Sequence, residues 1–189
     1  LCGTRDRYRE FSWKSYITTG RNGNKKTIAI RQPADGALAL RYEALGDMNT
    51  LLIPAPLPPG AADGLWQHTC CEAFVAGADG EAYREFNFSP SGQWAVYGFS
   101  ACRERDAGYH PSVAPTVAFQ RLPDGFRLDA LLARELLPSA SRFHVGLTAV
   151  IEAAAGGNSY WALAHCAARP DFHLRQSFVL TLDHPTCRP

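Results

Sequence analysis

Two glutamates in the middle of the chain, Glu72 and Glu85, have the residue type and spacing that could do chemistry. Side chains alternate between the two faces of a β-strand, so Glu72 would share a face with His68. On the next predicted strand, Glu85 would share a face with Asn87. If the two strands pair across the turn at 77–80, we expect the two carboxylates and the amide to converge.

Three interpretations of this polar strand surface are open. Two carboxyls about 5–10 Å apart that flank a glycosidic bond can act as the acid and the base of a glycosidase. A polar surface beside tryptophan rings can instead bind a sugar, because the rings stack on pyranose faces and the polar groups bond to hydroxyls. The third interpretation is a buried network in which every polar group is bonded within the protein. We favour the last two over catalysis.

Tryptophan and arginine side chains supply the remaining groups that a sugar-binding surface needs. Trp66, Trp94 and Trp161 each offer a ring for stacking, and Arg103 offers hydrogen-bond donors. The sequence leaves open which two of the three rings face each other.

A second cluster lies near the carboxyl end of the chain. Trp161 and His165 fall on one face of a predicted strand, and Asp171 and His173 lie two residues apart in a loop that begins at Pro170. An Asp–His pair can orient a catalytic imidazole or bind a metal. An aspartate in such a loop more often bonds to nearby backbone groups, and we favour that role.

Several motifs with known chemistry are missing from the sequence. No serine lies in a Gly-x-Ser-x-Gly elbow, and no glycine-rich phosphate loop is present. The cysteines form no Cys-x-x-Cys pair, so we predict no metal site and expect buried, reduced thiols. Reduced thiols favour a cytoplasmic location for the protein. The alternative is a periplasmic location, if a signal peptide has been removed. The six cysteines are Cys2, Cys70, Cys71, Cys102, Cys166 and Cys187.

We therefore predict a ligand site without catalytic or metal-ligating residues. Its candidate residues are Trp66, His68, Glu72, Glu85, Asn87, Trp94, Arg103, Trp161, His165 and His173.

Short β-type runs, separated by glycine and proline, must position these residues. Phe86 and Phe88 share one face of the run 83–89, and the odd positions of 142–152 form an unbroken apolar face. The gaps are too short for the helices of a parallel α/β fold. We predict an all-β antiparallel β-sandwich with at most one or two short helices, of which 130–137 is the candidate. The predicted strands are 27–32, 37–43, 50–53, 68–76, 83–89, 93–99, 116–122, 125–132, 142–152, 159–165 and 177–182.

Length and charge bound the organisation of the chain. Its 189 residues suit one domain, and its net charge of +1 argues against a nucleic-acid-binding protein. No apolar run approaches the roughly 18 residues that span a bilayer, so we predict no membrane partner. Residues 1–26 hold seven basic and two acidic side chains, which predicts a basic extension. We place a single β-sandwich ligand-binding domain at 27–189.

The order of motifs resembles the bacterial DOMON-like proteins, which are similar to the family 9 carbohydrate-binding modules. The resemblance covers roughly 37–182 and rests on LWQHTCCEAFVAG, EAYREFNFSPSGQWAVYGFSACR, GFRLDALLARELLP and SYWALAHCAARPDFH. It implies a sandwich with an acidic residue in an early strand, here Glu72. A strand and turn of the type Tyr-x-x-Phe-x-x-x-Pro-x-Gly follow, and members of the wider group bind sugars or haem.

We interpret the chain as a non-catalytic ligand-binding domain whose ligand is a saccharide or another small molecule. It would bind carbohydrate through tryptophan stacking and a polar strand face, without a cofactor. One alternative is a haem-binding DOMON-type domain, with a histidine and Met48 as candidate iron ligands. A second is a glycosidase-like enzyme that uses Glu72 and Glu85. A third is an interaction domain whose basic amino-terminal arm binds an acidic partner.

Overall fold

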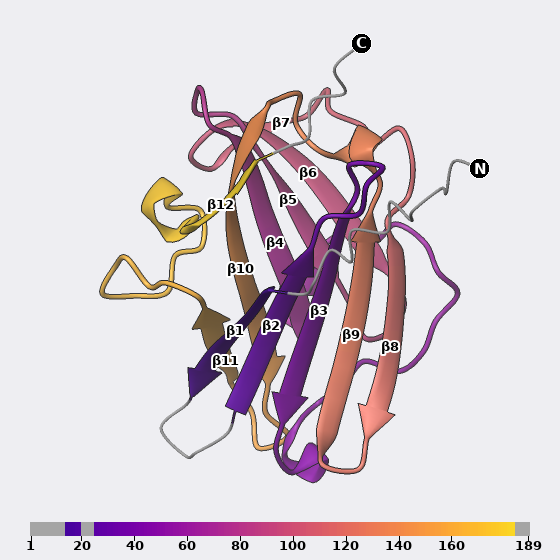
Figure 1. Cartoon of the computed structure of the whole chain (residues 1–189). Helices are drawn as coiled ribbons and strands as arrows, with labels where there is room; N and C mark the ends of the chain where they lie inside the picture. The colour runs from indigo at the N-terminus through magenta and orange to yellow at the C-terminus, as the bar shows by residue number, and fades with distance from the viewer. Residues whose placement is uncertain (1–13, 20–24, 184–189) are drawn as a thin grey trace, which may run out of the picture.

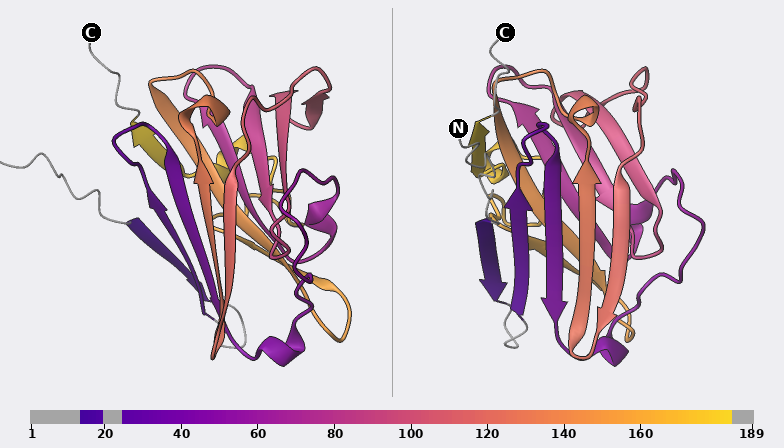
Figure 2. Two further views of the ribbon diagram at one scale, coloured as in Figure 1. Left: turned by 90° about the vertical axis from the view of Figure 1, so that its right-hand side faces the viewer. Right: turned by 45° about the vertical axis from the view of Figure 1, so that its right-hand side comes forward.

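The computed structural model describes residues 14–19 and 25–183, which form two antiparallel sheets lying face to face (Figures 1 and 2). This confirms the predicted all-β sandwich. The first sheet has the order β1 (Lys14–Thr19), β2 (Lys25–Arg31), β3 (Leu38–Leu45), β9 (Gly125–Leu132) and β8 (Thr116–Leu122). The second has the order β11 (Asn158–Ala162), β10 (Arg142–Glu152), β4 (Cys70–Gly77), β5 (Tyr83–Phe88), β6 (Trp94–Ala101) and β7 (Glu104–Asp106), with β12 (Leu180–Asp183) also paired to β10.

The main core lies between the sheets and follows the predicted alternation. Phe86 and Phe88 on β5 point into it, as do Phe143, Val145 and Leu147 on β10, and all five are fully buried. Burial of such side chains is the dominant favourable contribution to folding. The period-two pattern therefore determines which face of each strand is turned to the partner sheet.

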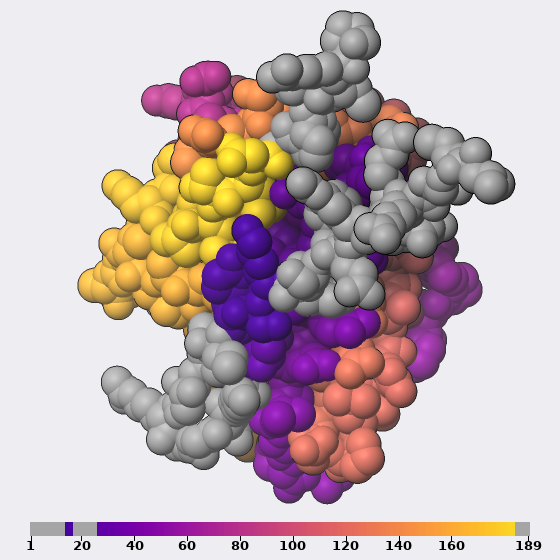
Figure 3. Space-filling model, in the orientation of Figure 1, coloured from indigo at the N-terminus to yellow at the C-terminus, as the bar shows by residue number. Residues whose placement is uncertain are grey.

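The outer faces of the two sheets differ. The five-stranded sheet, whose outer face is in view in Figure 3, carries ion pairs from Arg41 to Asp129 at 2.7 Å and from Arg127 to Glu43 at 2.8 Å. The second sheet is covered on its outer face by the segment 163–179, from which Phe172 packs on buried strand residues. A second apolar cluster thus forms outside the sandwich core, and this sheet has an outer face that is sheltered by a described segment of the chain.

The β5–β6 hairpin has the turn chemistry that its sequence predicts. Gly92 adopts a φ of 92°, a left-handed conformation that favours glycine, and its N–H donates to the Ser89 carbonyl over 3.0 Å. The Ser91 N–H donates to the Ser89 hydroxyl over 3.1 Å. This tight turn sets the register that pairs Glu85 with Tyr97.

Two predicted elements are wrong. The predicted helix 130–137 is instead the end of β9 followed by η3 (Arg134–Leu136), a single 3-10 turn. Leu128, Ala130 and Leu132 alternate into the core and pair with β3, and this tertiary pairing overrides the local preference for helix. The predicted strand 50–53 is only an isolated bridge from Leu51 to Ala153 after η1 (Met48–Thr50).

The remaining differences lie at the ends of elements. β1 pairs with β2 in an antiparallel register, so residues 14–19 of the predicted extension belong to the sheet and the predicted boundary at 27 falls inside β2. Residues 1–13 lie outside the described part of the chain. β7 was not predicted. The other short helical turns are η2 (Leu65–Gln67) and η4 (Arg175–Ser177). Within the described ranges, no helix has the length and apolar character needed to cross a membrane.

Candidate functional site

A cavity of about 330 Å³ opens on the outer face of the second sheet. Its lining includes six key aromatic or charged side chains. They are Trp66, Glu72, Glu85, Arg103, Tyr160 and His173.

The floor of the cavity is formed by β4, β5 and β10. Glu72 on β4 lies opposite Asn87 on β5 and opposite Thr148 on β10. Glu85 lies two residues before Asn87, so it projects from the same face of the sheet. The predicted pairing of these two strands is therefore confirmed, and it brings the polar side chains together as expected.

Glu72 is buried at the centre of the floor, with 3% of its surface exposed. The Thr148 hydroxyl donates to its Oε2 over 2.7 Å. Burial, followed by the nearby charge of Glu85, raises the pKa of Glu72 to about 8. At neutral pH this carboxyl is therefore mainly protonated and able to donate a hydrogen bond.

Glu85 is 5% exposed and lies beside Glu72 on the next strand. Asn87 Nδ2 donates to Glu85 Oε1 over 2.7 Å, while Oε2 lies 3.7 Å from His173 Nε2. Burial raises the pKa of Glu85, and the hydrogen bond from Asn87 opposes this shift. The Cys70 thiol makes a long contact of 3.6 Å with Asn87 Oδ1, so the Asn87 side chain is held in place beneath Glu85.

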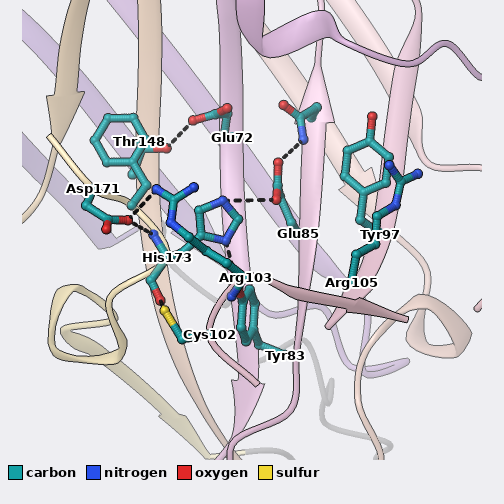
Figure 4. A network of polar contacts seen from close by, with 12 residues as sticks. Glu72, Tyr83, Glu85, Tyr97, Cys102, Arg103, Arg105, Thr148, Asp171 and His173 are labelled. Carbon is teal, nitrogen blue, oxygen red and sulfur yellow. Dashed lines mark hydrogen bonds and ion pairs between the residues drawn. The ribbon is translucent and has the colours of Figure 1, made fainter. Parts of the chain in front are cut away.

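His173 links the floor to the covering segment (Figure 4). The Tyr83 hydroxyl lies 2.7 Å from His173 Nδ1 and accepts the Arg103 backbone N–H over 3.2 Å. Burial, followed by the charge of Arg103, lowers the pKa of His173 to about 4. In a neutral imidazole one nitrogen donates and the other accepts; the Glu85 carboxyl beside Nε2 favours the proton on Nε2, with Nδ1 accepting from the Tyr83 hydroxyl.

Asp171 has the loop-structuring role that the sequence predicts. Its Oδ1 accepts the His173 backbone N–H over 3.1 Å. The same oxygen accepts a hydrogen bond from Arg103 over 2.9 Å, which ties the covering segment to the β6–β7 turn. Arg103 adopts a φ of 60°, a left-handed conformation that is uncommon for a residue other than glycine.

A second arginine and an aspartate complete the polar rim. The Arg105 guanidinium carbon lies 4.1 Å from the centre of the Tyr97 ring, and its Nη1 is 3.9 Å from Asp63. The Tyr97 hydroxyl donates a hydrogen bond to Asp63. This bond is the main reason that the pKa of Asp63 is lowered.

Two half-exposed aromatic rings stand beside the polar floor. Trp66 on η2 is 50% exposed and Tyr160 on β11 is 46% exposed, and both line the cavity. Asn158 Nδ2 donates to the Gln67 carbonyl over 3.2 Å, which ties η2 to β11. The two rings are therefore held on neighbouring elements at the mouth of the cavity.

Half of the sequence-predicted residues line the cavity, namely Trp66, Glu72, Glu85, Arg103 and His173. Asn87 lies beneath them and contacts Glu85.

Two of the predicted tryptophans lie elsewhere. Trp161 follows Tyr160 on a strand and so points to the opposite face, where the Lys26 ammonium lies 3.5 Å from its ring. Trp94 pairs with Phe88 and packs against the sandwich core. Neither lines the cavity, and stacking by either residue is not supported by its position.

The two other predicted histidines also lie outside the cavity lining. His68 Nδ1 lies 2.9 Å from Glu152 at an exposed position, although the alternation placed His68 with Glu72. The strand begins only at Cys70, so the predicted alternation does not extend to His68. His165 is exposed, and the centre of its ring is 6.1 Å from that of Phe172.

Among the charged and tyrosine residues that line the cavity, sequence reasoning missed four: Asp63, Tyr97, Arg105 and Tyr160. Tyr97 could have been found from the hairpin register, because it lies opposite Glu85. Tyr160 was passed over in favour of its neighbour Trp161. No local signal marks Asp63, because it reaches the site through a loop.

The cavity offers no free histidine nitrogen to a haem iron among its lining residues. His173 is the histidine that lines it, and its two nitrogens face Tyr83 and Glu85. Met48, the other candidate iron ligand, packs against the sandwich core. In the described ranges, no group of three or more His, Cys, Asp or Glu residues is placed to hold a metal ion. The residues present therefore do not fit haem at this site.

The cysteines are only partly as expected. Cys70 and Cys71 are buried, whereas Cys102 and Cys166 are exposed, and all four are free thiols. Cys2 and Cys187 lie outside the described residues.

Comparisons with known proteins find similarity in structure and none in sequence. No family model matches the chain, and no curated protein matches it. A candidate carbohydrate-binding protein from Bacteroides uniformis has a TM-score of 0.67 at 14% identity, over 92% of this chain and 86% of its own. A family 9 carbohydrate-binding module from Caldicellulosiruptor kristjanssonii, solved with glucose, has a TM-score of 0.59 at 13% identity, over 96% of this chain and 87% of that one.

The fold is a carbohydrate-binding-module-like β-sandwich. A family 9 module from C. kristjanssonii solved with cellotriose adds a TM-score of 0.53 at 14% identity, over 85% of this chain and 75% of that one. At these identities the likeness establishes the carbohydrate-binding-module-like fold alone. The resemblance to DOMON-like proteins stays a prediction.

Proposed function

We propose that this chain is a non-catalytic domain that binds a saccharide in the cavity on the outer face of its second sheet. The observation that supports this most directly is the placement of Trp66 and Tyr160. Two half-exposed aromatic rings line the same cavity as two buried carboxyls. Stacking of flat rings on sugar faces and hydrogen bonds to hydroxyls are the two contacts that a saccharide needs.

The polar floor supplies both kinds of hydrogen bond that a hydroxyl makes. Glu72, with its pKa near 8, can donate as well as accept, and Glu85 can accept. Arg103 and Arg105 add donors at the rim. The cavity of about 330 Å³ falls within the size range of small-molecule sites.

The positions of the two carboxyls support binding over catalysis. In glycosidases the two groups flank the scissile bond, so that one protonates the leaving oxygen and the other acts on the opposite side. Glu72 and Glu85 project from one face of neighbouring strands, so both lie on the same side of a ligand in the cavity. The solved neighbours with glucose and cellotriose are binding modules, which agrees with this proposal.

Titration with neutral saccharides tests the proposal. Glucose, xylose, cellobiose and cellotriose are added while tryptophan fluorescence and the heat of binding are recorded. We expect binding by at least one of them, and Trp66→Ala and Tyr160→Ala should each weaken it by about tenfold or more. Trp161→Ala removes a tryptophan outside the cavity and is the matched control, with thermal unfolding to verify its fold.

Two results would contradict the proposal. One is a protein that is folded by circular dichroism but binds no saccharide across a broad glycan panel. The other is binding that Trp66→Ala and Trp161→Ala weaken equally, because the ligand would then lie elsewhere.

A further inference from the structure

The charges around the cavity do not balance at its floor. Four carboxyl groups and two guanidinium groups surround it. Arg103 is bonded to Asp171 at 2.9 Å, and Arg105 lies 3.9 Å from Asp63. The two arginines are thus each placed beside a rim carboxylate. No described arginine or lysine lies within ion-pair distance of either floor carboxyl, Glu72 or Glu85.

The remaining group near the floor is His173, and it does not supply the missing charge. Its Nε2 is 3.7 Å from Glu85, but its pKa of about 4 leaves the ring neutral at pH 7. The Thr148 hydroxyl and the Asn87 amide, which are neutral, are the side chains that donate to the floor carboxyls. The floor therefore combines two nearly buried acids whose direct hydrogen-bond donors are neutral, while the charges of Arg105 and Arg103 act on Glu85 only from the rim, beyond ion-pair distance.

Each floor carboxyl also keeps one oxygen without a hydrogen bond. Thr148 donates to Oε2 of Glu72 and Asn87 donates to Oε1 of Glu85. Within the described part of the chain, the other oxygen of Glu72 has no side-chain donor, and that of Glu85 has His173 Nε2 at 3.7 Å, which is beyond hydrogen-bond distance. Both residues line the cavity, so the second oxygen of each carboxyl is open to a hydrogen-bond donor of a ligand bound there.

The walls of the cavity suit a positively charged group. Trp66, Tyr160, Phe99 and Phe172 line it, and the faces of aromatic rings attract cations. An ammonium group carries three donors and no acceptor, which matches two carboxyl oxygens that lack donors.

We propose that the ligand carries a primary ammonium group, as an amino sugar does, and that this group lies between Glu72 and Glu85. This inference rests on the proposed function, because it names the chemical class of the saccharide. An acidic sugar is the competing choice, but the arginines that would bind its carboxylate already lie beside Asp171 and Asp63.

A proton is released when such a ligand binds at neutral pH. Glu72 is mainly protonated in the free protein, since its pKa is about 8. An ammonium group nearby favours the ionised carboxylate, so the proton leaves for the solvent. Binding of a neutral sugar brings no charge to the floor and should release none.

The test compares each amino sugar with its neutral parent by calorimetry at pH 7. The pairs are glucosamine with glucose, galactosamine with galactose, and mannosamine with mannose, and N-acetylglucosamine is a further control without the charge. We expect at least one amino sugar to bind about tenfold or more tightly than its parent. Its heat of binding should change with the ionisation enthalpy of the buffer, as proton release requires.

Two variants locate the ammonium group. Glu85→Gln and Glu72→Gln should each bring the ratio of amino-sugar to neutral-sugar affinity close to one. Glu152→Gln is the matched control, because Glu152 pairs with His68 outside the cavity lining and should leave the ratio unchanged.

The outcomes separate this inference from the proposed function. If each neutral sugar binds as tightly as its amine, or glucuronic acid binds more tightly than glucosamine, the inference is wrong and saccharide binding stands. N-acetylglucosamine binding as tightly as glucosamine would also overturn it. If no sugar, neutral or charged, binds in a Trp66-dependent manner, the proposed function itself is wrong.

Discussion

A hydrogen bond of 2.7 Å joins the Tyr83 hydroxyl to Nδ1 of His173, although 90 residues separate them in the sequence. This bond holds the His173 ring in an orientation that places Nε2 3.7 Å from Glu85 Oε2. One hydroxyl on β5 thereby joins the covering segment to the floor of the cavity.

Tyr83→Phe should lower the free energy of unfolding by about 1–2 kcal/mol, because a partly buried imidazole nitrogen and the Arg103 N–H lose their partner. Saccharide affinity should also fall, because His173 is no longer held beside Glu85. Urea unfolding and calorimetry measure the two effects. Tyr109→Phe is the control, since the Tyr109 hydroxyl makes no hydrogen bond within the described residues. Equal loss in both variants would show that the bond to His173 is unimportant.

Stability should fall as the pH rises from about 6.5 to 8. The pKa of Glu72 is raised from 4.5 to about 8 in the folded protein, so between these values the folded state holds a proton that the unfolded chain has lost. His173, with its pKa lowered from 6.5 to about 4, has the opposite effect, but only below about pH 6.5. Above that pH we expect the wild type to lose about 1–2 kcal/mol of stability.

Glu72→Gln tests the origin of this pH dependence. The amide does not titrate, so the variant should show a flatter dependence of unfolding free energy on pH between 6.5 and 8. Urea unfolding at closely spaced pH values measures the slope. Glu135→Gln, at an exposed position on η3, should follow the wild type. Parallel curves for the wild type and Glu72→Gln would exclude Glu72 as the source.

Gly125→Ala should destabilise the first sheet by about 3 kcal/mol. A Cβ at Gly125 would overlap the carbonyl oxygen of Ala44 and come within 3.0 Å of the Leu45 Cα, so β3 and β9 would have to separate. Gly60→Ala is the control, because its Cβ would meet nothing nearer than the Pro58 carbonyl oxygen at 4.0 Å. Its effect should be within about 0.5 kcal/mol. Chemical unfolding compares the two, and a tolerated alanine at 125 would contradict the close strand approach.

The sequence could predict which segments form strands and which side chains of each strand point to the core, because both depend on neighbouring residues. Three predicted strands, 116–122, 125–132 and 142–152, have the observed bounds. The floor of the site was found for the same reason, since Glu72 and Glu85 alternate with the apolar residues of their strands. The false helix at 130–137 arose because its leucines suit either structure, and only pairing with β3 decides between them.

Alternation along each strand, which the sequence alone contains, determined the sandwich, its core and the polar face on which Glu72, Glu85 and Asn87 meet. The tertiary structure decided which aromatic rings stand over that face. It placed Tyr160 there and turned Trp161 away, and it joined η2 to β11 through Asn158 and Gln67. Alternation is a property of adjacent residues, whereas loop positions depend on contacts between residues far apart in the chain, and no local pattern encodes those contacts.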